Sequence, residues 1–392
     1  MRRLRLEVVA SYPNRHFLDP IKLMPADAFE RRYWFFEGMP DFRRSLGWDI
    51  PQPFRLLRGS GGVRAMLAAI QALRKADVNI FYGLVMAGPW HLFLVIVSLY
   101  FGKPTFIMSE GLRHRVQSDW KRWLLAALCN RSNACLLACG DGAAEDYLGL
   151  GFDRWSYRRY GFAEVGAPTV AHTSSADEIH LLSSGRLIPR KNMISLLRCL
   201  REIAPAGRIV VDIAGEGPER PQLEAEGRLL PPNVELRLHG HCQRERLNEL
   251  FDRADIFVLP SLYDGWGVVV NEALAHHVPT LVSARVRAGL GFLVRPGVNG
   301  FIYQNDEEYR THLSALLSDA SLRERLRAGA GTIADQWDIN SMATRLATVL
   351  AGKEVEPIDG PLDPIHPQAT AWWGHAFEVD LPPDPEFSSK VK

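Results

Sequence analysis

The sequence has few of the features that mark disulfide-rich, zinc-binding or membrane-spanning proteins. Its 392 residues include five cysteines, an odd number, and none of them forms a C-x-x-C pair. Neither a disulfide framework nor a zinc site is indicated, so reduced thiols in a cytoplasmic protein are the simpler interpretation. The most apolar run, PWHLFLVIVSLYF at 89–101, is far shorter than the roughly 20 residues that cross a bilayer. We expect a buried helix there.

The chain also has almost no net charge, at +1, but its charge is unevenly distributed. Residues 1–160 contain 23 Lys and Arg against 14 Asp and Glu, whereas the remainder contains 23 against 31. One explanation of this difference is chance variation between two surfaces. The other is that the N-terminal half binds an anionic partner, such as lipid headgroups or a phosphorylated acceptor. We expect no nucleic-acid partner.

What the sequence does contain is two series of short apolar strands that alternate with amphipathic helices. The expected strands are 4–10, 78–83, 104–109 and 134–139, and then 179–185, 208–215, 234–240, 255–260 and 280–284. Alternating strands and helices predict parallel sheets covered on both faces. The expected class is therefore α/β, with two doubly wound, Rossmann-like domains that face each other across a cleft.

The boundary between these domains is expected in GFAEVGAPTVAHTSSADE (161–178), which is rich in small and polar residues and has no period. We expect an N-terminal domain over 1–165, a C-terminal domain over 166–345 and an extended, proline-rich tail over 346–392. Ligands of such sheets bind outside the carboxyl ends of the strands.

Two motifs follow expected strands in the second half. In SSGRLIPRKN (183–192), Arg186 follows Gly185 directly and Lys191 opens the next helix, which suits two phosphate groups. A solvated basic turn is the alternative, and we interpret Arg190 as such a surface charge. In AGEGPER (214–220), Gly215 and Gly217 allow a close backbone approach, although the third glycine of a dinucleotide fingerprint is missing. We interpret this motif as a turn beside a nucleotide pocket.

A third motif, LYDGWGVVVNEAL (262–274), places two acids eight positions apart. Asp264 lies just ahead of a predicted helix of about three turns that ends before Pro279, and Glu272 lies two turns inside it. Gly265 and Gly267 leave the first N–H groups of this helix open to a phosphate or a sugar oxygen. An acid with no cation beside it suits the hydroxyl groups of sugars, but an N-cap and a solvated helix residue explain the same pattern.

In this order, over about ninety residues, the three motifs resemble the C-terminal domain of glycosyltransferase family 4, which has the GT-B fold. The sequence PGVNGFIY (296–303) resembles the strand after that family's nucleotide-binding helix, and the resemblance covers roughly residues 180–345. It implies a retaining enzyme that moves a sugar from a nucleotide-diphosphate sugar to an acceptor and needs no bound metal or cofactor.

The resemblance also implies roles for individual residues. Arg186 and Lys191 would neutralise the diphosphate, Glu272 would accept hydrogen bonds from the ribose, and Asp264 would hold hydroxyls of the transferred sugar. The backbone of 265–268 would line the same pocket. The implied donor-binding residues are Gly185, Arg186, Lys191, Gly215, Gly217, Asp264, Gly265, Trp266, Gly267, Val268 and Glu272.

The sequence departs from the family pattern in two places. Most members have Glu where this chain has Asp264, whose side chain is one methylene shorter. The N-terminal half matches only loosely, and Glu110 stands where several members place a histidine near the reacting centre. Glu110 or His114 would face the donor sugar, and Glu110 is the preferred candidate. The implied catalytic residues are Asp264, Glu110, Lys191 and Arg186.

Residues 111–133 are basic, with Trp120 and Trp123 among the cations, as in helices that lie at a membrane interface. One hypothesis is contact with anionic lipids of the inner leaflet, where a glycan or lipid-linked acceptor would be presented; an ordinary surface helix is the alternative. A sugar-nucleotide epimerase, a phosphorylase and an inactive sugar-nucleotide-binding protein of the same fold are the competing functions.

Overall fold

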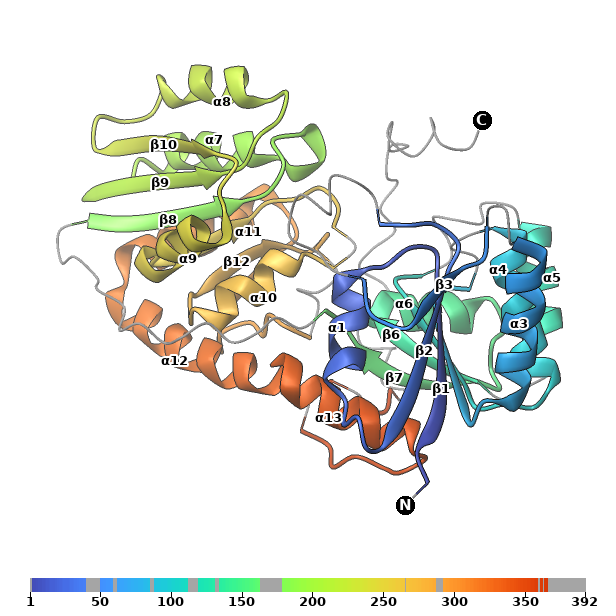
Figure 1. Cartoon of the computed structure of the whole chain (residues 1–392). Coiled ribbons are helices and arrows are strands. Elements are labelled where there is room, and N and C mark those ends of the chain that lie inside the picture. The colour runs from blue at the N-terminus through green and yellow to red at the C-terminus, as the bar shows by residue number, and fades with distance from the viewer. Residues whose placement is uncertain are drawn as a thin grey trace.

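A computed structural model describes the chain over residues 2–39, 50–58, 62–84, 88–111, 119–130, 134–162, 178–264, 266–286, 292–358, 360–361 and 363–365. The described residues form two lobes, each built on a parallel sheet with helices packed against it (Figure 1). The α/β architecture expected from the sequence is therefore present.

The N-terminal sheet has seven strands in the order β3-β2-β1-β4-β5-β6-β7. Its strands are β1 (Leu4–Ala10), β2 (Phe29–Phe35), β3 (Phe54–Leu56), β4 (Val78–Tyr82), β5 (Thr105–Ser109), β6 (Cys135–Cys139) and β7 (Ser156–Tyr160). The helices of this lobe are α1 (Arg15–Leu23), α3 (Gly62–Lys75), α4 (Pro89–Tyr100), α5 (Asp119–Cys129) and α6 (Asp141–Gly149).

Strands β2, β3 and β7 were not expected from the sequence. In β2, FERRYWF, a glutamate and two arginines interrupt the apolar run. In β7, SYRRY, two arginines do the same. Both strands therefore lack the continuous hydrophobicity that identified β1, β4, β5 and β6.

The C-terminal sheet has six strands in the order β10-β9-β8-β11-β12-β13, all parallel. They are β8 (Glu178–Ser184), β9 (Arg208–Ala214), β10 (Val234–Gly240), β11 (Ile256–Leu259), β12 (Thr280–Ser283) and β13 (Gly300–Tyr303). The first five match expected strands, and β13 lies within the PGVNGFIY segment. The helical elements are η1 (Pro189–Lys191), α7 (Met193–Ile203), α8 (Arg220–Gly227), α9 (Arg244–Arg253), α10 (Val268–Ala275), α11 (Asp306–Ser318), α12 (Ala320–Gln336) and α13 (Ile339–Leu350).

Helices α12 and α13 return the chain from the second lobe to the first (Figure 1). Helix α13 packs against α1, and its apolar residues Met342, Leu346 and Leu350 are buried in the hydrophobic core that includes the N-terminal sheet. The helix runs through residue 345, so an extended tail does not begin at 346 as we expected. The linker expected at 161–178 lies mostly outside the described residues, and the domain boundaries stay proposals.

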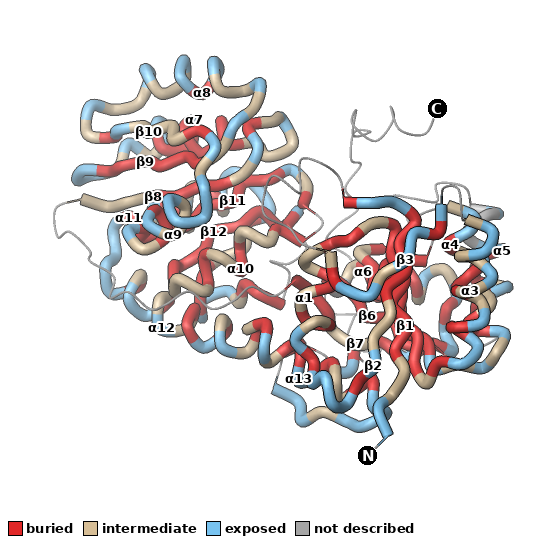
Figure 2. Tube along the Cα trace, in the orientation of Figure 1, coloured by how far each residue is buried: buried red, intermediate tan, exposed pale blue. Residues whose placement is uncertain are grey.

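Burial is concentrated in the strands of both sheets, while the helices turn one side to solvent (Figure 2). Helix α4 shows this clearly. His91, Leu94 and Val95 are buried, but Trp90 and Phe93 are 58% and 41% exposed. The expectation of a buried helix at 89–101 is therefore wrong for one face of the helix.

A polar cluster lies across β8, β9 and β10. His180 Nδ1 is 3.3 Å from Asp212 Oδ2, and His239 Nε2 is 2.5 Å from Asp212 Oδ1. The interaction with Asp212 raises the pKa of His180, although burial opposes it. Burial raises the pKa of Asp212, but the two histidines outweigh it, so that the net shift of this pKa is downward.

Candidate functional site

The three motifs meet at the carboxyl edge of the C-terminal sheet. Strand β8 lies between β9 and β11, so the strand order reverses there. In open parallel sheets, the crevice at such a reversal is where ligands bind. Residues 185–191 follow β8, residues 215–217 follow β9, and residues 261–267 follow β11. The fold therefore brings together segments that are up to about eighty residues apart in sequence.

Asp264 interacts with three side chains at this edge. Lys191 Nζ donates a hydrogen bond of 2.5 Å to Asp264 Oδ2, and the Ser261 hydroxyl donates one of 3.1 Å to the same oxygen. Arg190 Nη1 lies 3.5 Å from Asp264 Oδ1 and donates to the Tyr263 carbonyl at 2.6 Å. The interpretation of Asp264 as an acid without a cation is therefore wrong, as is that of Arg190 as a plain surface charge.

The Lys191–Asp264 ion pair is largely shielded from solvent. The exposed fractions of the two side chains are 11% and 13%. Two hydrogen bonds hold the loops that carry them: Leu262 N–H donates to the Arg190 carbonyl at 2.8 Å, and the side-chain amide of Asn192 donates to the Pro260 carbonyl at 3.3 Å. Lys191 ends the 3-10 turn η1 and does not open α7 as expected, because Asn192 adopts a left-handed conformation, with φ at +52°, between the two.

The glycines after β9 allow two loops to pack backbone against backbone. Gly185 N–H donates to the Ala214 carbonyl, and Leu187 N–H to the Glu216 carbonyl, both at 2.9 Å. A Cβ atom on Gly215 would lie 1.8 Å from the Gly185 carbonyl oxygen, and one on Gly217 would lie 2.3 Å from that of Leu187. The close approach that we expected from these glycines is thus an approach to the protein's own backbone, and it shapes the loop that carries Arg186.

Helix α10 carries the second acid of the motif and is shorter than expected. It begins at Val268, after Gly267 in a left-handed conformation with φ at +76°, and ends at Ala275. Glu272 therefore lies little more than one turn inside the helix. Arg244 Nη1 on α9 donates to Glu272 Oε1 at 3.2 Å, and 17% of the Glu272 side chain is exposed. Arg186 is exposed, and Gly265 lies outside the described residues.

Trp266 belongs to the contact between the lobes. It is 2% exposed, and its Nε1 donates to Asn271 Oδ1 at 2.7 Å. Its ring packs edge-on against Phe162 from the N-terminal half and tilted against Trp337. A Cβ atom on Gly161 would lie 2.1 Å from this ring. The Trp266 side chain is therefore committed to the core, and only its backbone remains a candidate to line a ligand pocket.

Glu110 follows β5 at the carboxyl edge of the N-terminal sheet. Burial raises the pKa of the Cys139 thiol well above its usual range, and the negative charge of Glu110 adds to this effect. The acid therefore lies near the end of β6 as well. The alternative candidate, His114, lies outside the described residues.

Within the described part of the chain, no three or more His, Cys, Asp and Glu side chains are grouped so that they could hold a metal ion. None of the helices in that same part has the length and apolar character needed to cross a membrane.

A comparison with family models matches residues 170–332 to the family described as glycosyl transferases group 1. The D-inositol 3-phosphate glycosyltransferase of Streptomyces griseus is 32% identical over 183 residues, which are 43% of this chain and 38% of that protein. The putative glycosyltransferase EpsF of Bacillus subtilis is 33% identical over 226 residues, or 52% of this chain and 58% of that protein. The chain thus aligns with 38% to 58% of the length of these curated relatives.

Solved structures match over more of the chain. HepE of Anabaena in complex with UDP aligns with a TM-score of 0.67 at 16% identity, over 89% of this chain and all of that one. The galactosyltransferase WaaB of the lipopolysaccharide outer core aligns with a TM-score of 0.63 at 14% identity, over 89% and 100%. The fold of this chain is therefore GT-B, with two Rossmann-like domains, and the glycosyl transferases group 1 match lies in the C-terminal part of this fold.

Proposed function

We propose that the chain is a retaining glycosyltransferase of family 4, which transfers a hexose from a nucleotide-diphosphate sugar without a metal ion. The observation that carries this proposal is the Lys191–Asp264 pair at the strand reversal of the C-terminal sheet, within the segment matched by the family model. The acceptor would be a glycan or a lipid-linked glycan of a cell-surface polysaccharide or glycoconjugate, and the reaction would take place on the cytoplasmic side of the membrane.

Arg186 and Lys191 would bind the diphosphate of the donor. Because Lys191 is paired with Asp264, an incoming diphosphate would replace one anionic partner of the ammonium group with another. Arg190 and Ser261 would continue to hold Asp264, whose carboxylate could then accept hydrogen bonds from hydroxyls of the donor sugar. Lys191 and Asp264 would thus act as a coupled pair that separates when the donor binds.

The nucleoside end of the donor would lie beside α10. Glu272 would accept hydrogen bonds from the ribose hydroxyls, and its contact with Arg244 fixes one carboxylate oxygen. The backbone of 265–268, including Gly267 and Val268, would contact the donor through N–H groups at the start of the helix. The loops that contain Gly185, Gly215 and Gly217 would form the other wall.

The reaction needs stabilisation of the nucleotide-diphosphate leaving group. Preorganised cations and backbone N–H groups supply such stabilisation where the negative charge develops. Arg186 and Lys191 are the candidates for this role. Glu110, or alternatively His114, would face the donor sugar from the N-terminal domain.

The N-terminal lobe would contact anionic lipids of the membrane that presents the acceptor. Three neighbouring helices carry large apolar side chains that are 41–78% exposed. This α3–α5 face comprises Val63, Leu67, Trp90, Phe93, Trp120, Trp123, Leu124 and Leu128. Tryptophan combined with the basic residues of 111–133 is typical of a segment at the lipid headgroup level.

Donor binding and turnover test the enzymatic proposal. A thermal-shift screen against UDP, GDP, ADP and their sugars should find a nucleotide that raises the melting temperature, because a ligand of the folded state stabilises it. The matching sugar nucleotide should be slowly hydrolysed, and Lys191→Ala should abolish this hydrolysis while the exposed control Lys353→Ala leaves it unchanged. Binding of the sugar nucleotide without its hydrolysis would refute the enzymatic proposal and favour an inactive sugar-nucleotide-binding protein.

Vesicle flotation tests the membrane contact. Recovery of the wild type with anionic vesicles should fall in a Trp120→Ala/Trp123→Ala variant, since both side chains are more than 60% exposed. Leu229→Ala, which removes an apolar side chain that is 58% exposed in the other lobe, is the matched control. Equal recovery of all three proteins would rule the contact out.

A further inference from the structure

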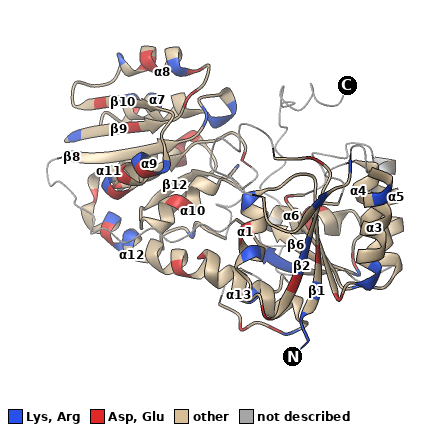
Figure 3. Cartoon of the chain, viewed as in Figure 1, with Lys and Arg blue, Asp and Glu red and all other residues tan. Residues whose placement is uncertain are grey.

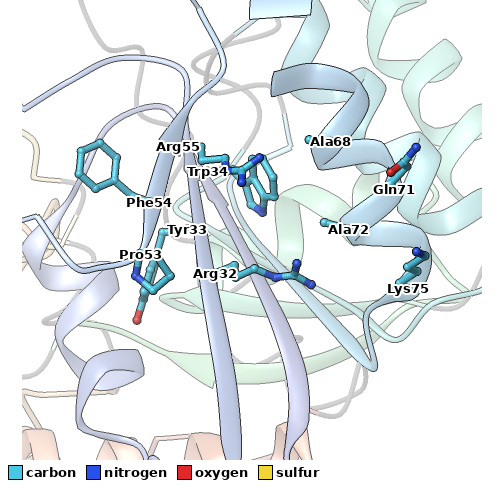
Figure 4. A pocket seen from close by; sticks show the side chains of 10 residues that line it. All are labelled: Arg32, Tyr33, Trp34, Pro53, Phe54, Arg55, Ala68, Gln71, Ala72 and Lys75. Carbon is cyan, nitrogen blue, oxygen red and sulfur yellow. The ribbon is translucent and has the colours of Figure 1, made fainter. Parts of the chain in front are cut away.

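A cavity lies in the N-terminal lobe, between α3 and the edge of the sheet. Its volume is about 320 Å³, and its lining comes from β2, the start of β3 and the C-terminal half of α3 (Figure 4). A cavity of this size is at the lower end of the range found for small-molecule sites. It is separate from the Lys191–Asp264 site, because α3 lies on the side of the N-terminal sheet that faces away from the C-terminal lobe (Figure 1).

Strand pairing and two small helix residues explain why the cavity exists. Side chains alternate between the faces of a strand, so Arg32 and Trp34 of β2 point toward α3 while Tyr33 points away (Figure 4). The facing positions on the helix are Ala68 and Ala72, one turn apart. Larger apolar side chains would fill this space, whereas the two methyl groups leave it open.

A buried carboxylate fixes the position of one cation in the cavity wall. Glu7 of β1 is fully buried; its Oε1 lies 2.6 Å from Arg32 Nη2, and the Trp34 Nε1 donates to its Oε2 at 2.7 Å. Burial raises the pKa of Glu7, and Trp34 and Arg32 act in the opposite direction. Glu7 thus bridges Trp34 and Arg32 and orients the Arg32 guanidinium group between sheet and helix.

Two further cations at the cavity have no acidic partner in the part of the chain that the structure describes. Arg55 pairs with Trp34 in the β2–β3 register and lies 5.9 Å from the centre of its ring. Lys75 lies in the last turn of α3. Among the described residues, neither side chain makes a hydrogen bond or an ion pair. Figure 3 shows this concentration of basic residues on β2 and at the end of α3. The lining therefore contains three cations, of which only Arg32 is paired with a carboxylate, that of Glu7 behind the wall.

We propose that this cavity binds a phosphate group, carried either by a soluble sugar phosphate or by a lipid headgroup. Cations from three separate elements converge on it, which suits the several oxygens of a phosphate, and a guanidinium group can bind two of these oxygens at once. The amide of Gln71 at the helix rim adds a neutral donor. The site would give the N-terminal domain a means to hold an anionic molecule that is independent of the donor pocket.

Calorimetric titration with inorganic phosphate tests the site. An Arg55→Glu/Lys75→Glu variant should lose this binding component or weaken it by roughly tenfold or more, because two charge-assisted contacts become repulsive. The matched control is Arg228→Glu/Arg325→Glu, which changes the net charge equally at two exposed positions of the other lobe. Lys191→Ala should leave the component unchanged, which separates it from phosphate bound at the donor site.

A second experiment, with lipid vesicles, shows whether the phosphate belongs to a lipid headgroup or to a soluble molecule. Phosphatidylcholine vesicles with and without phosphatidic acid are floated with the wild type and the same variants. A lipid source predicts a gain with phosphatidic acid that disappears in the double reversal, and a soluble source predicts an effect in calorimetry alone. If the milder Arg55→Gln/Lys75→Gln variant and the reversal both bind phosphate and vesicles as the wild type does, the proposal is overturned.

Discussion

The coupling between Lys191 and Asp264 leads to a prediction that separates their roles. Asp264→Asn keeps the shape of the side chain and an oxygen that can accept from Ser261, but it removes the charge that holds the ammonium group at 2.5 Å. Lys191 then has no anionic competitor for a diphosphate. We expect the variant to bind the nucleotide diphosphate with unchanged or up to about tenfold higher affinity, equivalent to about 1.4 kcal/mol.

The magnitudes follow from the surroundings of the pair. Breaking a fully buried ion pair costs about 3–5 kcal/mol, but these side chains are 11% and 13% exposed. We therefore expect a stability loss of about 1–3 kcal/mol. Turnover should fall roughly ten- to hundredfold, because hydrogen bonds between sugar hydroxyls and a charged acceptor contribute about 1.5–3 kcal/mol. Lys191→Met should instead lose both properties: hydrolysis is abolished, and nucleotide affinity falls roughly ten- to hundredfold because a charge-assisted contact to the diphosphate is lost.

Calorimetry with the nucleotide diphosphate and a donor-hydrolysis assay, performed on the same preparations, measure the two effects. Urea unfolding accounts for the loss of stability, and Ser261→Ala, which removes one hydrogen bond to Asp264 but leaves its negative charge in place, is the control for local disturbance. If Asp264→Asn weakens nucleotide binding as much as it slows hydrolysis, the assignment of Lys191 to the diphosphate and Asp264 to the sugar is refuted.

Three further predictions concern the same domain. Glu272→Ala should weaken nucleotide binding by about 1.5–3 kcal/mol in calorimetry, because a charged acceptor is lost, and unchanged affinity would contradict its role. Gly215→Ala should lower the melting temperature, since its Cβ would overlap a backbone oxygen, whereas Gly38→Ala, with open space around it, should change little; equal shifts would contradict the argument. Asp212→Asn should lower the melting temperature most between about pH 4 and 6.5. Below this window the stabilisation is lost as the pH falls through the lowered pKa of Asp212, and above it the stabilisation is lost as the pH rises through the raised pKa of His180; a pH-independent difference would argue against the linkage.

The C-terminal half could be predicted well because its strands are buried on both faces. Segments such as RIVVDIA and IFVL are nearly continuous apolar runs, so hydrophobicity alone located β9 and β11. In the N-terminal half, β2 was missed because Arg32 faces a polar cavity and pairs with the buried Glu7. The partner that neutralises Arg32 lies 25 positions away in the sequence, so the local pattern does not indicate that this arginine can belong to a strand.

The sequence by itself determined the α/β class, the order of the motifs and the residue types at the site, since strand hydrophobicity and turn chemistry are local properties. Tertiary structure decided which of these residues touch. In the tertiary structure Lys191 and Arg190 contact Asp264, and the Trp266 ring is buried. Helix α13 packs against α1 of the first lobe. Such contacts depend on how parallel strands are ordered in a sheet and on how two lobes pack, and both join residues that are distant along the chain.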